Sequence, residues 1–124
     1  MRVIIAGSRG LGSADTMNAL ESSGWKDAIT EVVCGKADGP DSHGEMWAQY
    51  HGIPVEFFPA DWGRYGKAAG PLRNTRMAEY ASKGPERGAL MAVWDGKSAG
   101  TAHMITAAIW HGLWVYVYRP QKGD

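Results

Sequence analysis

Three short segments of this sequence combine glycine with hydroxyl or charged residues. They are residues 7–10 (GSRG), residues 35–41 (GKADGPD) and residues 95–101 (DGKSAGT). Glycine lets a backbone approach a phosphate without a Cβ in the way, and the freed N–H groups can point at the anion. A helix that begins at Gly100-Thr101 would add the partial positive charge of its N-terminus. These segments predict phosphate binding, and each is also compatible with an ordinary turn.

Charged and aromatic side chains near these segments fit the same chemistry. Arg9 offers a forked donor, and Ser98 offers a hydroxyl. Residues 64–76 contain four cations and no carboxylate. This stretch either holds a small anion or forms a solvated basic face. Trp62, just before it, could stack on a base or shield a pocket, and Trp94 beside residues 95–101 fits either core or ligand contact.

Several familiar sites are excluded. The first turn reads GSRGLG rather than GxGxxG, and no acidic residue closes the second expected strand, so the dehydrogenase fingerprint fails. Residues 96–98 (GKS) lack the earlier glycine of a P-loop. A single cysteine excludes an intramolecular disulfide, and no two histidines stand four residues apart. We therefore expect no metal site and no required cofactor beyond a bound ligand.

Length and composition narrow the class of protein further. The 124 residues suit one domain spanning 1–124, and a hydrophobic content of 44% is enough for a real core. The formal net charge is zero, which argues against a nucleic-acid partner on charge alone. No apolar run is long enough to span a bilayer. We expect a soluble, cytoplasmic protein without a membrane partner.

Short apolar runs alternate with amphipathic segments along the whole chain. Strands are expected at residues 2–6, 30–34, 53–58, 89–94 and 113–118, and helices at residues 15–22, 42–50, 71–81 and 101–110. Ser42 with Glu45 predicts a capping box for the second helix, and Asp41 is a rival N-cap. The helix at residues 101–110 would be capped by Ser98 or Thr101.

This alternation predicts an α/β fold: a Rossmann-like three-layer sandwich with a five-stranded, mainly parallel sheet. Right-handed crossovers leave few topologies, and the simplest has strand order 3-2-1-4-5. Ligands of such sheets lie beyond the carboxyl ends of the strands, where the strand order switches. That point falls between strands 1 and 4, so the three glycine-containing segments should meet there.

The last expected strand has one aromatic face. Tyr116 and Tyr118 alternate with Val115 and Val117. Such a face on a terminal strand is either an oligomer contact or a surface covered by helices. We expect a homo-oligomer, a dimer or higher.

Five motifs, taken together, resemble those of the YspA/cpYpsA-related branch of the SLOG superfamily. They are Gly7-Ser8-Arg9, residues 34–41 (CGKADGPD), residues 58–62 (FPADW), residues 69–77 (AGPLRNTRM) and residues 94–101 (WDGKSAGT). SLOG domains are Rossmann-like relatives of the Lonely guy phosphoribohydrolases and of the DprA DNA-processing proteins. Lys36 departs from the pattern, because a small residue is expected there.

The resemblance implies a pocket for a nucleotide or a nucleotide-derived molecule, such as one like ADP-ribose or NAD. Gly100 and Thr101 would hold phosphate, and Arg73 matches an arginine of the Lonely guy enzymes. The ligand-binding residues expected from the motifs and the resemblance are Gly7, Ser8, Arg9, Gly35, Lys36, Asp38, Gly39, Asp41, Trp62, Arg73, Asn74, Trp94, Asp95, Ser98, Gly100 and Thr101.

Catalysis is less well supported by the sequence. Lonely guy enzymes follow their Gly-Thr with a glutamate that assists cleavage of the N-glycosidic bond, and here no carboxylate follows Thr101 on that turn. Asp38, Asp41 or Asp95 could substitute from neighbouring loops. We therefore favour a binding protein, a sensor or a sequestering protein, over a nucleotide N-glycosidic hydrolase. Single-stranded nucleic-acid binding, as in DprA, is a second alternative.

Overall fold

Five parallel strands form the centre of the computed structural model, which describes residues 1–120. The strands are β1 (Arg2–Gly7), β2 (Glu31–Cys34), β3 (Val55–Phe57), β4 (Ala89–Val93) and β5 (Trp114–Tyr118). Their order is β3-β2-β1-β4-β5, as the sequence predicted, and every neighbouring pair is parallel. β1 therefore lies at the centre, between β2 and β4.

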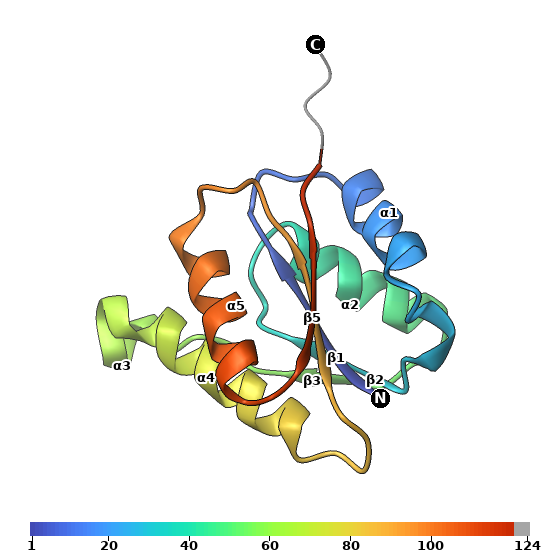
Figure 1. The fold of residues 1–124 in the computed structure, drawn as a ribbon. Coiled ribbons are helices and arrows are strands. Elements are labelled where there is room, and N and C mark those ends of the chain that lie inside the picture. Colours follow the sequence, from blue (N-terminus) through green and yellow to red (C-terminus); the bar gives the residue numbers. More distant parts are fainter. Residues whose placement is uncertain (121–124) are drawn as a thin grey trace.

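Helices cover both faces of the sheet and give the three layers that were predicted. One face carries α1 (Ser13–Ser23) and α2 (Pro40–Tyr50), and the other carries α4 (Ala69–Ser82) and α5 (Ala99–Trp110) (Figure 1). Successive side chains of a strand point to opposite faces. Val3 and Ile5 accordingly pack toward α1 and α2, whereas Ile4 and Ala6 pack toward α4 and α5. The two faces thus have separate apolar cores.

The connection between β3 and β4 carries the chain from one side of β1 to the other. It contains α4 and a four-residue helix, α3 (Trp62–Tyr65), which the sequence did not predict. The Asp61 side chain caps α3 by accepting the N–H of Arg64 at 3.1 Å. Two 3₁₀ turns, at Lys26–Ala28 and Gly66–Ala68, complete the elements.

The start of α2 differs from the prediction. The cap expected at Asp41 or Ser42 is wrong, because the helix begins at Pro40 after Gly39. Proline suits the first helical turn, where its missing N–H has no partner to lose, and Gly39 turns the chain with a φ of 82°. Ser42 instead donates its hydroxyl to the carbonyl of Ala37 at 3.1 Å. Asp41 consequently lies inside the fold.

The aromatic face of β5 is partly covered. Tyr116 packs edge-on against Trp25 and hydrogen-bonds Ser22 at the end of α1, with 2.6 Å between the two oxygens. Trp110 and Trp114, in contrast, remain 83% and 50% exposed. Assembly of several copies stays a prediction. Within residues 1–120, every helix is too short or too polar to cross a bilayer.

Candidate functional site

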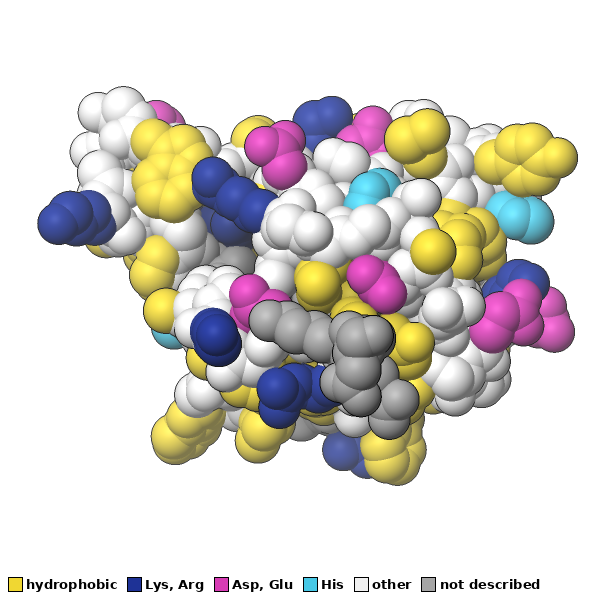
Figure 2. Space-filling view, turned by 90° about the horizontal axis from the view of Figure 1, so that it is seen from above, with side chains coloured by type: hydrophobic (Ala, Val, Ile, Leu, Met, Phe, Trp, Pro, Cys, Tyr) yellow, Lys and Arg dark blue, Asp and Glu magenta, His cyan; other side chains and the backbone are white. Residues whose placement is uncertain are grey.

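A pocket of about 600 Å³ opens at the carboxyl ends of β1 and β4, where the strand order switches. The space-filling view from above looks onto this edge of the sheet, where Lys and Arg side chains stand beside exposed hydrophobic groups (Figure 2). Eleven of the expected ligand-binding residues line the pocket: Gly7, Ser8, Arg9, Asp41, Trp62, Arg73, Asn74, Asp95, Ser98, Gly100 and Thr101. Its size lies in the range of small-molecule sites.

The remaining expected residues lie beside this pocket. Gly35, Lys36 and Asp38 line a neighbouring hollow of about 310 Å³. Gly39 and Trp94 line neither of these two spaces. The Trp94 indole instead donates its N–H to the carbonyl of Ser98 at 3.1 Å, which holds the loop between β4 and α5.

The N-terminus of α5 forms one wall of the pocket. Ser98 is its cap, and the Ser98 hydroxyl accepts the N–H of Thr101 at 3.4 Å and the Thr101 hydroxyl at 3.3 Å. The first N–H groups of a helix have no acceptor within the helix, and the helix dipole makes this end attractive to anions. A Cβ added to Gly100 would meet no atom within 4 Å, so the protein itself does not need glycine there.

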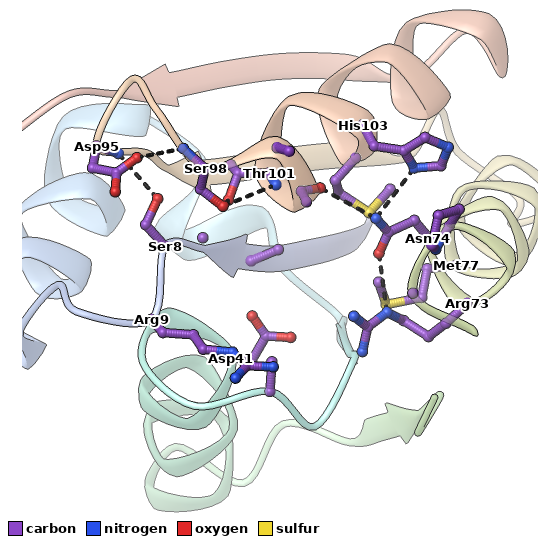
Figure 3. Close-up of a pocket in the computed structure, with 18 of the residues that line it drawn as sticks. Ser8, Arg9, Asp41, Arg73, Asn74, Met77, Asp95, Ser98, Thr101 and His103 are labelled. Carbon is purple, nitrogen blue, oxygen red and sulfur yellow. Dashed lines mark hydrogen bonds between the residues drawn. The ribbon is translucent and has the colours of Figure 1, made fainter. Parts of the chain in front are cut away.

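Asp95 braces the loop that leads into α5. Its Oδ1 accepts the N–H groups of Lys97 and Ser98, both at 2.8 Å, and its own N–H donates to the Ser8 hydroxyl at 3.1 Å (Figure 3). The hydrogen bonds from Ser98 and Lys97 lower the pKa of the Asp95 carboxyl. Asp95 is therefore ionised near neutral pH and is a poor proton donor there.

Asp41 occupies the opposite wall and is only 4% exposed. Burial raises the pKa of its carboxyl to about 6, although the Arg73 guanidinium and the backbone amides of Ala37, Gly7 and Gly35 act in the other direction. The carboxyl thus lies near the end of β1 and the loop after β2.

Two glycines expected to contact ligand also let the protein's own loops approach each other. A Cβ on Gly35 would lie 2.8 Å from both Arg73 Nη1 and Asp41 Oδ2. Gly39 has a φ of 82°, and a Cβ there would lie 2.8 Å from the carbonyl oxygen of Arg9. Sequence reasoning could not separate this packing role from contact with a phosphate, because both require a missing side chain.

Arg73 is held in place by a chain of hydrogen bonds. Its Nη1 donates to the Gly35 carbonyl, and its Nε donates to Asn74 Oδ1 at 3.0 Å. Asn74 is 5% exposed, and its Nδ2 donates to the Gly100 carbonyl at 3.3 Å and lies 3.3 Å from Nδ1 of His103 (Figure 3). The chain links the loop after β2, α4 and the start of α5, so it fixes a guanidinium at the pocket.

Arg9 and Trp62 stand at the mouth of the pocket. Arg9 is exposed, and its guanidinium makes no hydrogen bond or ion pair with the part of the chain that the structure describes. Trp62 is 53% exposed, and its ring lies over Gly70. Figure 3 shows Arg9, Asp41 and Arg73 across the pocket from Ser98 and Thr101. Arg9 is thus a cation free to meet a ligand.

Sequence reasoning missed the apolar side of the pocket. Met77 and Met104 line it and are each 1% exposed, and His103, Gly70 and Pro71 also line it. The apolar periodicity of α4 and α5 predicts core residues but does not say which of them also face a cavity.

Lys36 adopts a conformation that usually favours glycine, with a φ of 60°. Its ammonium lies 3.1 Å from Glu45 Oε1 and 4.8 Å from the centre of the Phe57 ring. A small residue, which the family pattern predicts at this position, would suit this backbone conformation. The positive charge of the Lys36 side chain is therefore already paired within the protein.

The single cysteine of the sequence, Cys34, is buried. Burial raises the pKa of the Cys34 thiol to about 11, so it stays protonated at neutral pH. Across residues 1–120, no three His, Cys, Asp or Glu side chains cluster in a way that could hold a metal ion.

Comparison with known proteins adds a family to this geometry. The family model described as "YspA, cpYpsA-related SLOG family" matches residues 1–65. The matched region includes the loops after β1 and β2, Asp41 and Trp62. Searches of curated proteins and of solved structures found no match.

Proposed function

This chain belongs to the YspA, cpYpsA-related SLOG family, and on that basis we propose that it binds a nucleotide or a nucleotide-derived small molecule. The ligand lies at the carboxyl ends of β1, β2 and β4, and the protein acts as a sensor or a sequestering protein. SLOG membership suggests the class of ligand, and the pocket supplies groups suited to each part of it.

The facing arrangement of cations and helix amides carries this proposal. A phosphate at the N-terminus of α5 would receive N–H groups near Gly100 and would face the guanidinium groups of Arg9 and Arg73. Asp41 subtracts charge from this side, but its carboxyl is buried, and burial favours its uncharged form. The exposed face of the pocket is consequently suited to an anion.

A base or another flat ring fits the apolar side. Met77 and Met104 line this side but are almost fully buried, so half-exposed Trp62 is the group that can stack on a ring at the mouth. A pocket with a cationic end and an aromatic, apolar end matches the two chemistries of a nucleotide. An ordinary inorganic anion would use only the first of them.

Calorimetric titration with AMP, ADP-ribose, NAD and cyclic nucleotides tests the proposal. We expect at least one to bind with a dissociation constant of roughly 1–100 μM. Arg9→Ala should weaken that binding, whereas Lys83→Ala removes an exposed cation just after the C-terminal end of α4 and should not. Absence of binding by every member of the panel at millimolar concentration would overturn the proposal.

A nucleotide N-glycosidic hydrolase is the second candidate, and Asp41 is the observation that favours it. A carboxyl with a pKa of about 6 at a pocket wall is suited to proton transfer near neutral pH. Asp38 and Asp95 are weaker candidates, since Asp38 lines the neighbouring hollow and Asp95 holds its own loop. Release of free base by the wild type, lost in Asp41→Asn, would establish hydrolysis. Nucleotides that remain intact after incubation with the wild type would show that the protein binds them without hydrolysing them.

A further inference from the structure

We propose that copies of this chain associate head to tail, with the end of α5 of one copy seated in an apolar groove between α1 and α2 of the next copy. The groove and the apolar end of α5 lie on opposite sides of the same sheet. Neither surface lines the pocket at the ends of β1 and β4, so this inference stands apart from the proposed function.

The groove lies on the side of the sheet that α1 and α2 cover, and it has a volume of about 340 Å³. Met17, Met46 and Tyr50 line it, together with His43 and His51. Met46 is 67% exposed and Tyr50 is 87% exposed, so this apolar lining faces solvent. The view from above shows exposed hydrophobic groups beside histidine side chains at the upper right of the molecule (Figure 2). The volume is sufficient for one large aromatic side chain.

A protruding apolar patch surrounds the turn from α5 to β5. Ile109 and Trp110 at the end of α5 are 63% and 83% exposed, and Trp114 at the start of β5 is 50% exposed. The Arg87 guanidinium lies 3.7 Å from the centre of the Trp114 ring, and its Nε donates to the Gly112 carbonyl at 2.7 Å. Tryptophan and arginine at an otherwise uncharged helix end are typical of protein–protein interfaces, and α5 contains no charged residue.

The charges of the chain are divided between these two sides. Residues 1–62, which supply α1 and α2, contain four basic and nine acidic side chains, whereas residues 63–120, which supply α4 and α5, contain eight and three. The two helices of the groove carry four carboxylates and no Lys or Arg, although Lys26 and Lys36 pair with two of these carboxylates. Arg87 makes no ion pair within residues 1–120. The protein is therefore neutral as a whole but carries opposite charge on its two sides.

This division of charge favours a head-to-tail contact over a two-fold symmetric one. A two-fold contact places the same surface of both copies together, so that the acidic side would meet the acidic side, or the basic side the basic side. A head-to-tail contact instead brings Arg87 of one copy toward the acidic helices of the next. It also moves the Trp110 ring out of water and onto Met46 and Tyr50. Each copy thus supplies the surface that the next copy lacks.

Sedimentation velocity of the wild type, Met46→Glu, Trp110→Glu and Thr75→Glu tests this arrangement. Thr75 is exposed on α4 and lines neither the groove nor the patch, so its substitution is the matched control for an added carboxylate. We expect the wild type and Thr75→Glu to form species larger than a monomer at about 100 μM, and added salt to weaken this association. Met46→Glu and Trp110→Glu should each weaken it by about thirtyfold or more. Both side chains are mostly exposed, so we expect both variants to fold.

An equimolar mixture of Met46→Glu and Trp110→Glu distinguishes the two kinds of contact. Met46→Glu keeps an intact patch and Trp110→Glu keeps an intact groove, so the mixture should form a dimer with one copy of each and no larger species. A two-fold contact would give no such mixed dimer. The inference would be overturned by a mixture that stays monomeric, by either variant associating as the wild type does, or by a wild type that is monomeric at about 1 mM. In the last case, the two surfaces would serve another partner or none.

Discussion

Asp41 and Arg73 face each other across the space that a single missing Cβ leaves open at Gly35. A methyl group there would lie 2.8 Å from Asp41 Oδ2 and 2.8 Å from Arg73 Nη1. Arg73 cannot swing aside freely, because it also bonds the Gly35 carbonyl and Asn74. The carboxylate and the guanidinium of the site are therefore placed by a glycine that need not touch the ligand at all.

Gly35→Ala tests this relationship. The added methyl group must displace Asp41 or Arg73, so we expect a loss of about 1–3 kcal/mol in the free energy of unfolding. Urea denaturation followed by circular dichroism measures it. A variant as stable as the wild type would show that the Asp41–Arg73 arrangement does not depend on Gly35.

Gly100→Ala should behave in the opposite way. No atom lies within 4 Å of the added Cβ, and alanine favours a helix, so stability should be unchanged or higher by up to about 1 kcal/mol. Ligand affinity should fall by about tenfold or more, because the methyl group occupies the space where a phosphate approaches the first amides of α5. Calorimetry measures the affinity.

Gly12→Ala is the matched control for that substitution. Gly12 precedes α1, also has no atom within 4 Å of an added Cβ, and lies outside the pocket. It should bind ligand as the wild type does. Wild-type affinity in Gly100→Ala would contradict a phosphate at this helix end.

Asp41 makes stability depend on pH with a definite sign. Its pKa is raised from the ordinary value of 3.8 to about 6, so the protonated form favours the folded state. The contribution is fully present below pH 3.8 and is lost as the pH rises through 6. Its size is on the order of 3 kcal/mol for a group this deeply buried.

Urea denaturation at pH 4 and pH 7.5 measures this dependence in the wild type and in Asp41→Asn. In Asp41→Asn, the free energy of unfolding at pH 4 minus that at pH 7.5 should differ from the wild-type value by the contribution of Asp41. Asp27→Asn, which changes an exposed residue, should leave this difference as in the wild type. An identical pH dependence in Asp41→Asn and the wild type would contradict the assignment.

Lys36 provides a test of the backbone in the loop after β2. With a φ of 60°, this position favours glycine, and the Lys36–Glu45 ion pair is half-exposed and worth little. We expect Lys36→Gly to be more stable than Lys36→Ala by about 1 kcal/mol, since both lose the ion pair and only glycine is relieved of strain. Thermal denaturation of the two variants compares them directly. Equal stability would mean that the left-handed backbone conformation does not destabilise Lys36→Ala relative to Lys36→Gly.

The strand order was predictable from the sequence because five apolar runs alternate with helical segments and right-handed crossovers leave few ways to arrange them. That order brought Ser8, Asp95 and Thr101 to one edge without further information. The start of α2 was not predictable in the same way, because Asp41 and Ser42 have good capping side chains that the fold uses elsewhere. Asp41 is buried at the pocket wall, and Ser42 bonds Ala37.

The site was predictable only in part, for a physical reason. Residue type alone is enough to predict that the glycine-containing loops belong to the site. Met77, Met104 and His103 have no such signal in the sequence, because they line the pocket only as a result of α4 packing beside α5. Lys36 and Asp38 line the neighbouring hollow, and Arg9, Trp62 and Arg73 line both that hollow and the main pocket. The division of one expected site into two spaces depends on where Arg9, Trp62 and Arg73 stand.

The central claim is that a nucleotide's phosphate lies between the N-terminus of α5 and the guanidinium groups of Arg9 and Arg73. Amide chemical shifts of the ¹⁵N-labelled protein, followed during titration with ADP-ribose, test it most directly. The largest changes should fall on Ser8, Arg9, Gly100 and Thr101, with smaller ones at Asn74. Changes confined to the outer surface of α1 and α2, or none at saturating ligand, would contradict it.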